Sequence, residues 1–327
     1  MKTVFLLFDS LNRLMLQPYG GDLVHTPNFE RLAKKSITYN KHYVGSMPCM
    51  PARRDMQSGR HSFLHRSWGP IEPFDNSFLE IFKQNKIYSH LISDHYHYWE
   101  DGGSTYHTRY NSFDFIRGQE SDPWKALLTS PIERIQKKYH PSQNDINSKQ
   151  NPYNYMINRE FIKKEEDFPS VQCFKKGFEF LDINKDADNY FLQIETFDPH
   201  EPFFAPERFK EKYKTNYKGP ILDWPRYSRV TEGQNEIDEL RANYFALLSL
   251  CDHLLGEVLD YFDKHDLWKD TALICATDHG FLLGEHDWWA KNRMPLYEEI
   301  SHIPLFIYHP DYKSKAGESR NCLTQTV

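Results

Sequence analysis

The amino-acid sequence predicts an α/β fold built on a large mixed, mostly parallel sheet. Short apolar segments typical of strands alternate with segments whose apolar residues recur at helical spacing, and this alternation indicates a sheet covered by helices on both faces. Four of the strand segments end in Asp or His. At 327 residues, of which 39% are hydrophobic, the chain can bury a large core, and we expect a single domain over residues 1–327.

The first predicted unit is a strand, a loop and a helix. The strand covers residues 2–9 (KTVFLLFD) and ends in Asp9. The helix covers residues 26–36 (TPNFERLAKKS), where Thr26 is the expected N-cap and Pro27 takes the first helical position. Asp9 is therefore expected at the carboxyl end of a buried strand.

Later segments repeat this design. Helices are predicted at residues 76–86 and 240–265, and strands within residues 87–98, 189–203 and 271–286. Ligands of parallel sheets bind outside the carboxyl ends of the strands, so the polar residues that follow these strands should meet at one rim. These residues are Asp9, Asp94, His95, His97, Asp198, His200, Asp278 and His279.

The segment of about residues 101–170 has a different composition. It is rich in Asn, Ser, Lys, Glu, Pro and Tyr, and its apolar residues show little periodicity. We expect a loop-rich insertion there, placed where it can line the entrance of a substrate site.

Composition and charge exclude several classes of protein. The net charge of −6 is spread along the chain, so neither a basic stripe for nucleic acid nor an acidic disordered tail is present. The first apolar run is too short, and too soon followed by Asp9, for a signal peptide or a membrane span. We therefore expect no nucleic-acid partner, no membrane association and a cytoplasmic location; the oligomeric state is not predicted.

The cysteines indicate neither a disulfide framework nor a zinc site, because their number is odd and their spacing is wide. They are Cys49, Cys173, Cys251, Cys275 and Cys322. Cys49 stands apart because it lies between two prolines and ahead of two arginines, in the stretch SMPCMPARRDMQSGRH of residues 46–61.

This stretch resembles the signature of the sulfatase family. CMPAR at residues 49–53 matches Cys-x-Pro-x-Arg, and the SGR that follows resembles the usual Thr-Gly-Arg. Asp9, YGG, TPNFERLA, DPHEPF and TDHGFLLGEHDWWAK appear in the order of the family, so the resemblance spans almost the whole chain. It implies an alkaline-phosphatase-like three-layer sandwich and a cysteine that is oxidised to formylglycine by a formylglycine-generating enzyme.

Formylglycine has a chemical advantage over serine in this reaction. Its hydrated aldehyde carries two hydroxyl groups, one to attack the sulfur or phosphorus and one to expel the acquired group afterwards. Such a diol needs a neighbouring cation and a metal to hold the anionic oxygens. The resemblance implies Cys49 as the formylglycine position, Arg53 as its arginine, and a metal held by Asp9, Cys49, Asp278 and His279.

The metal set departs from the common sulfatase pattern. Most sulfatases carry two consecutive aspartates here, whereas this chain has Asp9 followed by Ser10. Either Ser10 is a weak metal ligand, or a water molecule takes the ligand position of the missing aspartate. One divalent metal is expected, Ca²⁺ first, with Mn²⁺, Mg²⁺ or Zn²⁺ as alternatives because the set includes an imidazole. Phosphonate monoester hydrolases resemble this chain in lacking the second aspartate and in pairing Asp with His late in the chain.

Further site residues come from the same resemblance. His97 matches the histidine that accepts a proton when the diol collapses, and His95 takes the place of a lysine that contacts substrate. On an extended segment these two side chains would project to the same side. His200 and Lys291 match the histidine and lysine that bind the ester oxygen and assist the leaving group.

Each of these residues also has a purely structural interpretation. Cys49 is otherwise a buried thiol, Asp9 a strand-end residue, and Asp278 with His279 a turn pair. A packing role for His95 is as compatible with the sequence as a catalytic one. Lys291 is otherwise a solvent-facing charge.

The sequence thus predicts a hydrolase that cleaves sulfate esters of small molecules or saccharides. The alternatives are a phosphonate monoester or phosphodiester hydrolase of the same superfamily, and an inactive anion-binding fragment. Sulfatases continue into a smaller antiparallel C-terminal sheet, and we expect that subdomain to be absent or truncated here, because the chain stops at Val327.

Overall fold

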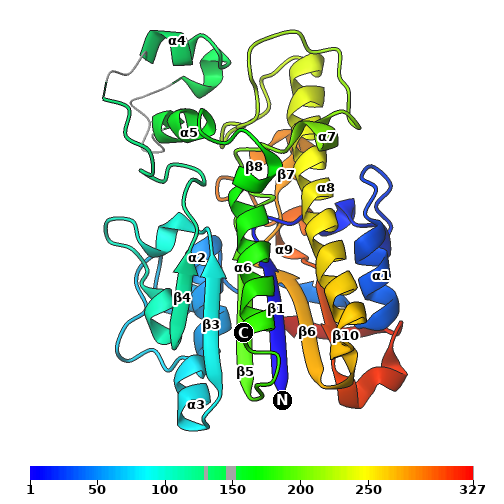
Figure 1. Ribbon diagram of the computed structural model, residues 1–327. Helices are drawn as coiled ribbons and strands as arrows, with labels where there is room; N and C mark the ends of the chain where they lie inside the picture. The colour runs from blue at the N-terminus through cyan, green and yellow to red at the C-terminus, as the bar shows by residue number, and fades with distance from the viewer. Residues whose placement is uncertain (129–131, 145–151, 327) are drawn as a thin grey trace.

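The computed structural model describes residues 1–128, 132–144 and 152–326 (Figure 1). Its main sheet has eight strands in the order β10-β2-β9-β6-β1-β5-β3-β4. Neighbouring strands are parallel except for β9, which is antiparallel to both β2 and β6. The strands are β1 (Lys2–Phe8), β2 (Ile37–Tyr43), β3 (Tyr88–Ser93), β4 (Ser112–Phe115), β5 (Tyr190–Thr196), β6 (Thr271–Thr277), β9 (Leu305–Tyr308) and β10 (Ser319–Gln325), with a small hairpin of β7 (Leu282–Leu283) and β8 (Trp289–Ala290).

Helices cover both faces of this sheet. In Figure 1, α6 and α8 run along one face, and α1 packs beside α8, while α2 lies behind the strands. The longer helices are α1 (Pro27–Lys35), α2 (Cys49–Ser58), α3 (Phe78–Gln84), α5 (Pro152–Arg159), α6 (Pro169–Ile183) and α8 (Gln234–Lys264). Shorter helices are α4 (Ile132–Gln136), α7 (Glu207–Lys210) and α9 (Glu298–Ser301).

Two hydrophobic cores lie on opposite faces of the sheet, because successive side chains of a strand point to opposite sides. On β5, Leu192 joins the larger core beneath α1, α6 and α8, whereas Phe191 joins a smaller core that includes Met50 of α2 and Leu79 of α3. The architecture is therefore a three-layer α/β sandwich, as the sequence predicts.

The register of the central strands brings the predicted polar residues to one rim. Phe8 of β1 pairs with Thr277 of β6 and with Thr196 of β5, and Ser93 of β3 pairs with Glu195. The residues that follow each strand therefore emerge side by side at the carboxyl ends. Figure 1 places α4 and α5 beyond this same end of the sheet.

Two local expectations change in the structure. Thr26 lies at the N-cap of α1, but its hydroxyl accepts from the backbone of Gln17 and caps no helical N–H group. The range 101–170, expected to be rich in loops, also supplies β4 at the edge of the sheet as well as α4 and α5. Residues 129–131 and 145–151 of that range lie outside the described residues.

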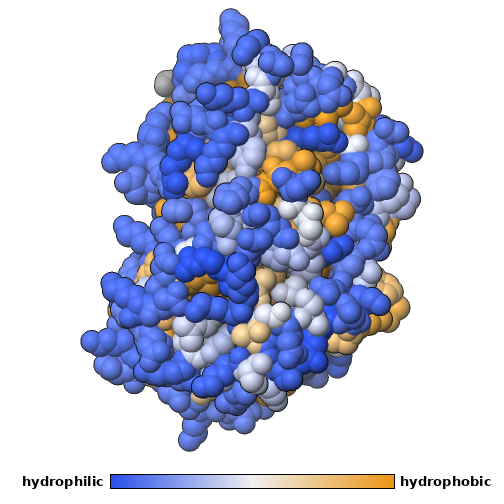
Figure 2. All heavy atoms as spheres, turned by 90° about the vertical axis from the view of Figure 1, so that its right-hand side faces the viewer, coloured by the Kyte–Doolittle hydropathy of each residue, from blue (hydrophilic) through white to orange (hydrophobic). Residues whose placement is uncertain are grey.

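Hydrophilic residues cover most of the face seen in Figure 2. Hydrophobic residues gather there in separate patches. Among the helices that the structure describes, none is long and apolar enough to cross a bilayer.

Candidate active site

The N-terminus of α2 holds Cys49 against the rim where β1 and β6 end. Cys49 is 2% exposed. Its Sγ lies 3.8 Å from Oδ1 of Asp9 and 3.3 Å from Nε2 of His279. Residues from three distant parts of the chain, at positions 9, 49 and 279, thus meet at one buried point.

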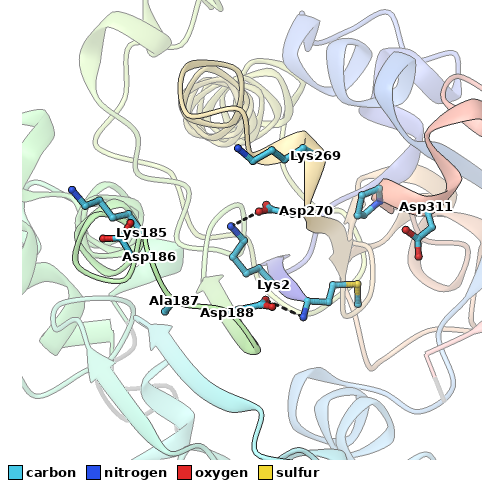
Figure 3. Close-up of a pocket in the computed structure, with 10 residues that line it drawn as sticks. Lys2, Lys185, Asp186, Ala187, Asp188, Lys269, Asp270 and Asp311 are labelled. Atoms are coloured by element: carbon cyan, nitrogen blue, oxygen red, sulfur yellow. Dashed lines mark ion pairs between the residues drawn. The ribbon is translucent and has the colours of Figure 1, made fainter.

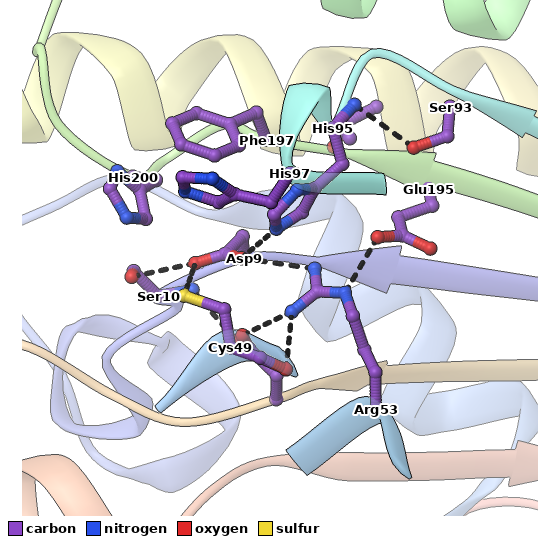
Figure 4. A network of polar contacts seen from close by, with 12 residues as sticks. Asp9, Ser10, Cys49, Arg53, Ser93, His95, His97, Glu195, Phe197 and His200 are labelled. Carbon is purple, nitrogen blue, oxygen red and sulfur yellow. Dashed lines mark hydrogen bonds and ion pairs between the residues drawn. The ribbon is translucent and has the colours of Figure 1, made fainter. Parts of the chain in front are cut away.

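Arg53 lies one helical turn after Cys49 and joins the surrounding carboxylates. Its Nη2 donates to Asp9 at 2.9 Å, its Nη1 to Asp278 at 2.6 Å, and its Nε to Glu195 at 2.7 Å. Figure 4 shows the guanidinium between Asp9, Glu195 and the backbone carbonyl of Cys49. Arg53 is 2% exposed, and an arginine that is buried this fully needs such partners.

Four side chains at this point could hold a metal ion. One ligand atom from each of Asp9, Cys49, Asp278 and His279 lies within 4.8 Å of the others, and all four residues are buried. The Nδ1 of His279 donates to the carbonyl of Gly280, so its Nε2 carries the free lone pair. Carboxylate oxygens with one imidazole fit a divalent cation.

Electrostatics keep the Asp9 carboxylate charged. Burial alone would raise the pKa of Asp9, but Arg53, the hydrogen bond from His95 and the charge of Lys291 hold it well below its usual value. For Cys49 the balance is opposite, because burial and the Asp9 charge raise the pKa of the thiol well above its usual value. The unmodified thiol is therefore a weak nucleophile in this environment.

Ser10 connects Asp9 to Lys291. Its hydroxyl donates to Oδ1 of Asp9 at 2.8 Å and accepts from Nζ of Lys291 at 2.9 Å. Lys291 is 1% exposed, and the surrounding anions, Glu201 and Asp9 among them, raise its pKa despite burial. A lysine donates a proton readily near neutral pH only when its pKa is lowered. The raised pKa of Lys291 therefore favours a lasting positive charge, which suits it to holding an anion.

His95 and His97 lie beside each other but have different partners. The Nε2 of His95 donates to Oδ2 of Asp9 at 3.1 Å, and His95 is fully buried. His97 lies in a 3₁₀ turn, Tyr96–Tyr98, so the expectation of an extended segment is wrong at this residue. The rings still approach to 5.1 Å between centroids, because the turn folds His97 back over His95.

His97 pairs with two glutamates instead of with Asp9 or Cys49. Its Nδ1 lies 2.9 Å from Glu100, and its Nε2 lies 3.5 Å from Glu120. Burial would lower the pKa of His97, but Glu120 and Glu100 raise it above its ordinary value. A protonated His97 donates hydrogen bonds and has no lone pair to accept a proton.

His200 completes the set of predicted residues. It follows β5, is 3% exposed, and packs against Phe197 with ring centroids 4.0 Å apart. Burial and the charge of Lys291 hold its pKa well below the ordinary value, so the ring is neutral. Figure 4 shows His200 and His97 on the same side of Asp9.

Sequence reasoning did not identify three buried carboxylates of this region, those of Glu120, Glu195 and Glu201. A signal for Glu195 was present, because an acidic residue within the apolar strand YFLQIET requires a buried partner. Glu201 directly follows His200 in DPHEPF, and the sequence pattern alone assigns it no role. Glu120 lies in the segment expected to be loop-rich, where the pattern contains no signal for it.

A buried bridge holds the loops that carry these groups. The amide nitrogen of Gln119 donates to Asp94 and to Asp198, at 3.1 Å in both cases. Asp94 follows β3, Asp198 follows β5, and Gln119 directly precedes Glu120. The bridge therefore ties Glu120 to the rim that carries His95 and His200.

The three-layer fold, with this buried cluster at the carboxyl ends of its strands, is the architecture of the alkaline-phosphatase-like superfamily. The family model described as Sulfatase matches residues 2–326. The chain belongs to the sulfatase family.

Individual relatives are distant but cover nearly all of the chain. A multifunctional alkaline phosphatase superfamily protein, PehA of Trinickia caryophylli, is 23% identical over 98% of this chain and 69% of its own length. An arylsulfatase of Clostridium perfringens is 21% identical over 96% of this chain and 70% of its own length. The solved phosphonate monoester hydrolase of Agrobacterium radiobacter superposes with a TM-score of 0.73 at 15% identity, covering 99% of this chain and 71% of that one. At this identity the structural likeness concerns the fold.

Proposed function

We propose that this protein hydrolyses sulfate esters of small molecules or saccharides, with a formylglycine formed from Cys49 and one divalent metal ion. The observation that carries the proposal is the position of Cys49, at the start of α2 and between Asp9 and His279, with Arg53 one turn away. Maturation would require a formylglycine-generating enzyme.

The metal would be held by Asp9, Asp278, His279 and the side chain at position 49, with Ca²⁺ as the first candidate. When bound, a divalent ion would neutralise negative charge on the sulfate and on the attacking hydroxyl. Ser10 stands where most sulfatases have the second aspartate. Its hydroxyl donates to Oδ1 of Asp9 and accepts from Lys291, so Ser10 would orient a metal ligand.

The roles proposed for the remaining groups follow from the charge that each one carries. Arg53 fixes the carboxylates that surround position 49, and Lys291 supplies a permanent positive charge for the sulfate oxygens. A neutral His200 can hydrogen-bond the ester oxygen. The protonation of His97, favoured by its two glutamates, supports a role as proton donor to the leaving alcohol instead of the predicted role as acceptor.

A second candidate is hydrolysis of phosphonate monoesters or phosphodiesters. Ser10 in place of a second aspartate supports it, because the site then carries one carboxylate fewer beside the metal. A third outcome is an inactive protein that binds anions in the presence of metal without turning them over.

The test is a parallel hydrolysis assay with an aryl sulfate, a phenyl phosphonate ester and a phosphodiester. The protein is matured with a formylglycine-generating enzyme, conversion at position 49 is verified by peptide mass, and Cys49→Ala is the control. We expect the sulfate to be preferred and Cys49→Ala to lose on the order of a thousandfold or more in kcat/KM.

Three other results would change the assignment. Preference for either phosphorus substrate would favour the second candidate, and metal-dependent anion binding by fully converted protein without turnover would favour the third. Turnover that survives in Cys49→Ala would exclude the formylglycine mechanism.

A further inference from the structure

Gln119 is a buried glutamine to which the proposed chemistry assigns no role. It is 9% exposed, and its amide nitrogen lies 3.1 Å from Oδ2 of Asp94 and 3.1 Å from Oδ1 of Asp198. A side-chain amide carries two N–H hydrogens, so each aspartate can accept one of them. The glutamine therefore joins the segment that follows β3 to the segment that follows β5.

Both aspartates are anchored through their other oxygen as well. Oδ1 of Asp94 accepts from the backbone N–H of Phe197 at 2.7 Å, and Oδ2 of Asp198 accepts from the hydroxyl of Ser170 in α6 at 2.5 Å. The two carboxylates are buried, so a hydrogen bond that they lose is not replaced by one to bulk water. Gln119 is thus attached to firmly held points of the rim.

Glu120 lies in a turn that this attachment holds in place. The turn is closed by a hydrogen bond from the backbone N–H of Asp122 to the carbonyl of Gln119 at 3.0 Å, and Arg117 pairs with the carboxylate of the same Asp122 at 2.7 Å. The backbone of Glu120 has φ of 44°, in the left-handed region that non-glycine residues seldom adopt. Such a conformation costs free energy and persists where the surrounding structure imposes it.

The side chain of Glu120 faces His97. Its Oε2 lies 3.5 Å from Nε2 of the ring, while Glu100 lies 2.9 Å from Nδ1. Glu120 is 5% exposed, so its carboxylate meets the ring with little water between. Other rings pack around the imidazole and keep it in place, those of Trp68, His95 and Phe197. A movement of the turn would therefore separate Glu120 from Nε2 while the ring stayed where it is.

The charge of His97 depends on the acidic groups around it. Burial lowers the pKa of His97, whereas Glu120, Glu100 and Asp9 raise it, and the net change is upward. The neighbouring His95 is neutral, because burial holds its pKa well below the ordinary value. Asp9 is a proposed metal ligand and would share its charge with the metal. The two glutamates are therefore the partners on which the charge of His97 rests.

We propose that Gln119 is a positioning residue for His97, because it fastens the turn of residues 117–122 to the rim and so holds the Glu120 carboxylate at Nε2 of the ring. The inference rests on the proposed function, in which His97 gives a proton to the leaving alcohol. A histidine held between two carboxylates keeps both its orientation and its proton, and a general acid needs both. Without the fastening, Glu120 leaves its left-handed conformation and moves away from the ring.

The first experiment measures the pKa of His97 without any turnover. The full chain, with Cys49 unconverted, is labelled with nitrogen-15 in its histidines and titrated by NMR in the presence of Ca²⁺, and His97→Gln identifies the signal. Gln119→Met removes both donated hydrogen bonds at similar side-chain size. We expect the pKa of His97 to fall by about one unit in this variant, because the Glu120 carboxylate no longer stays at Nε2.

Gln143→Met is the matched control. Gln143 is 5% exposed, and its amide donates to the buried Asp223 at 2.9 Å. In the described part of the chain, its hydrogen bonds involve neither Glu120 nor His97. This variant therefore carries the same kind of loss and should leave the pKa of His97 unchanged.

Glu120→Gln completes a double-mutant cycle. It should lower the pKa of His97 as Gln119→Met does, and the double variant should show no further fall, because both changes remove the same contact. In matured protein the same shift should appear in the pH dependence of kcat/KM. The limb at which His97 loses its proton should move to lower pH.

An unchanged pKa of His97 in folded Gln119→Met or Glu120→Gln would overturn the proposal, as would an equal fall in Gln143→Met or additive falls in the double variant. If Gln119→Met does not fold, Gln119→Asn decides, since the shorter amide cannot donate to both aspartates from the same backbone position. A lowered pKa of His97 with an unmoved pH dependence of hydrolysis would support Gln119 as a positioning residue and contradict the proton-donor role. Failure of the inference and failure of the proposed function are therefore separate results.

Discussion

The two ends of the same sheet carry charged clusters of different kinds. At the amino end, a pocket is lined by Met1, Lys2, Asp188 and Asp270 (Figure 3). Two ion pairs lie in it, with Lys2 2.8 Å from Asp270 and the terminal amine 3.0 Å from Asp188. At the carboxyl end, the cluster around Arg53 is buried and has more carboxylates than cations.

This difference separates a stabilising cluster from a functional one. The pair of the terminal amine with Asp188 is exposed on both sides, and the pair of Lys2 with Asp270 on the side of the aspartate. Pairs that water reaches cost little to form and contribute little, since water screens them. Buried charges without full compensation reduce stability, and they persist where a ligand or a reaction supplies the missing partner. The excess of acid, more than the presence of charge, marks the carboxyl end as the candidate active site.

The largest expected effect comes from removing the cation that holds the buried cluster. Arg53→Met leaves Asp9, Asp278 and Glu195 without their shared partner, and we expect the free energy of unfolding to fall by about 3–5 kcal/mol. Denaturant unfolding measures it. Arg54→Met is the matched control, because Arg54 is equally buried but pairs with one carboxylate, that of Asp75. An equal or smaller loss in Arg53→Met than in this control would contradict the comparison.

The second effect is a pH dependence at the Gln119 bridge. Burial raises the pKa of Asp198 to about 6, above its unfolded value near 3.8, so folding favours the protonated form. The resulting stabilisation is complete below about pH 4 and is lost as the pH rises through 6, by about 3 kcal/mol in total. Asp198→Asn should remove that part of the slope of unfolding free energy between pH 4 and 6.5. An unchanged slope would show that Asp198 does not titrate in this range.

The stabilisation of the protein by metal should depend on the ligands at the carboxyl end of the sheet and not on residues at the amino end. Ca²⁺ at a hundredfold excess over its Kd should increase the free energy of unfolding by about 2.7 kcal/mol, seen as a higher melting temperature. Asp278→Asn should abolish the shift. Asp270→Asn, at the other end of the sheet, should retain it, and a shift that vanishes in both variants or in neither would argue against the proposed ligands.

The smallest effect is expected at the amino-end pocket. Asp270→Asn removes the partner of Lys2, and we expect a loss of less than about 1 kcal/mol that shrinks further in high salt. Hydrolytic activity should not change. A larger loss, or one that is insensitive to salt, would mean that this pair is shielded from water as the carboxyl-end cluster is.

Much of the site could be predicted because the positions of its residues follow from local patterns. Asp9 and Asp278 each follow a buried apolar strand, and adjacent parallel strands bring such residues together at one rim. Cys49 and Arg53 are separated by one helical turn, so their proximity also follows from the sequence once α2 begins at Cys49.

Other features depend on contacts between distant segments. His97 was expected on an extended segment, but a 3₁₀ turn directs it toward Glu100 and Glu120. The protonation of His97 and Lys291 is decided by the carboxylates around them, which come from other parts of the chain. Glu120 could not be placed, because its position depends on the hydrogen bonds that Gln119 makes to two strand ends.

The sequence by itself indicated the family, the neighbouring strands β6, β1, β5 and β3, the helices α1, α3 and α8, and the polar residues that follow those strands, because periodicity and short motifs are local properties of the chain. Only the tertiary structure decided which charges are paired, which are left over, and which protonation state each group favours. The physical reason is that pairing and desolvation depend on distances of a few ångströms between residues such as Glu120, Glu201 and Lys291, which are far apart in the sequence.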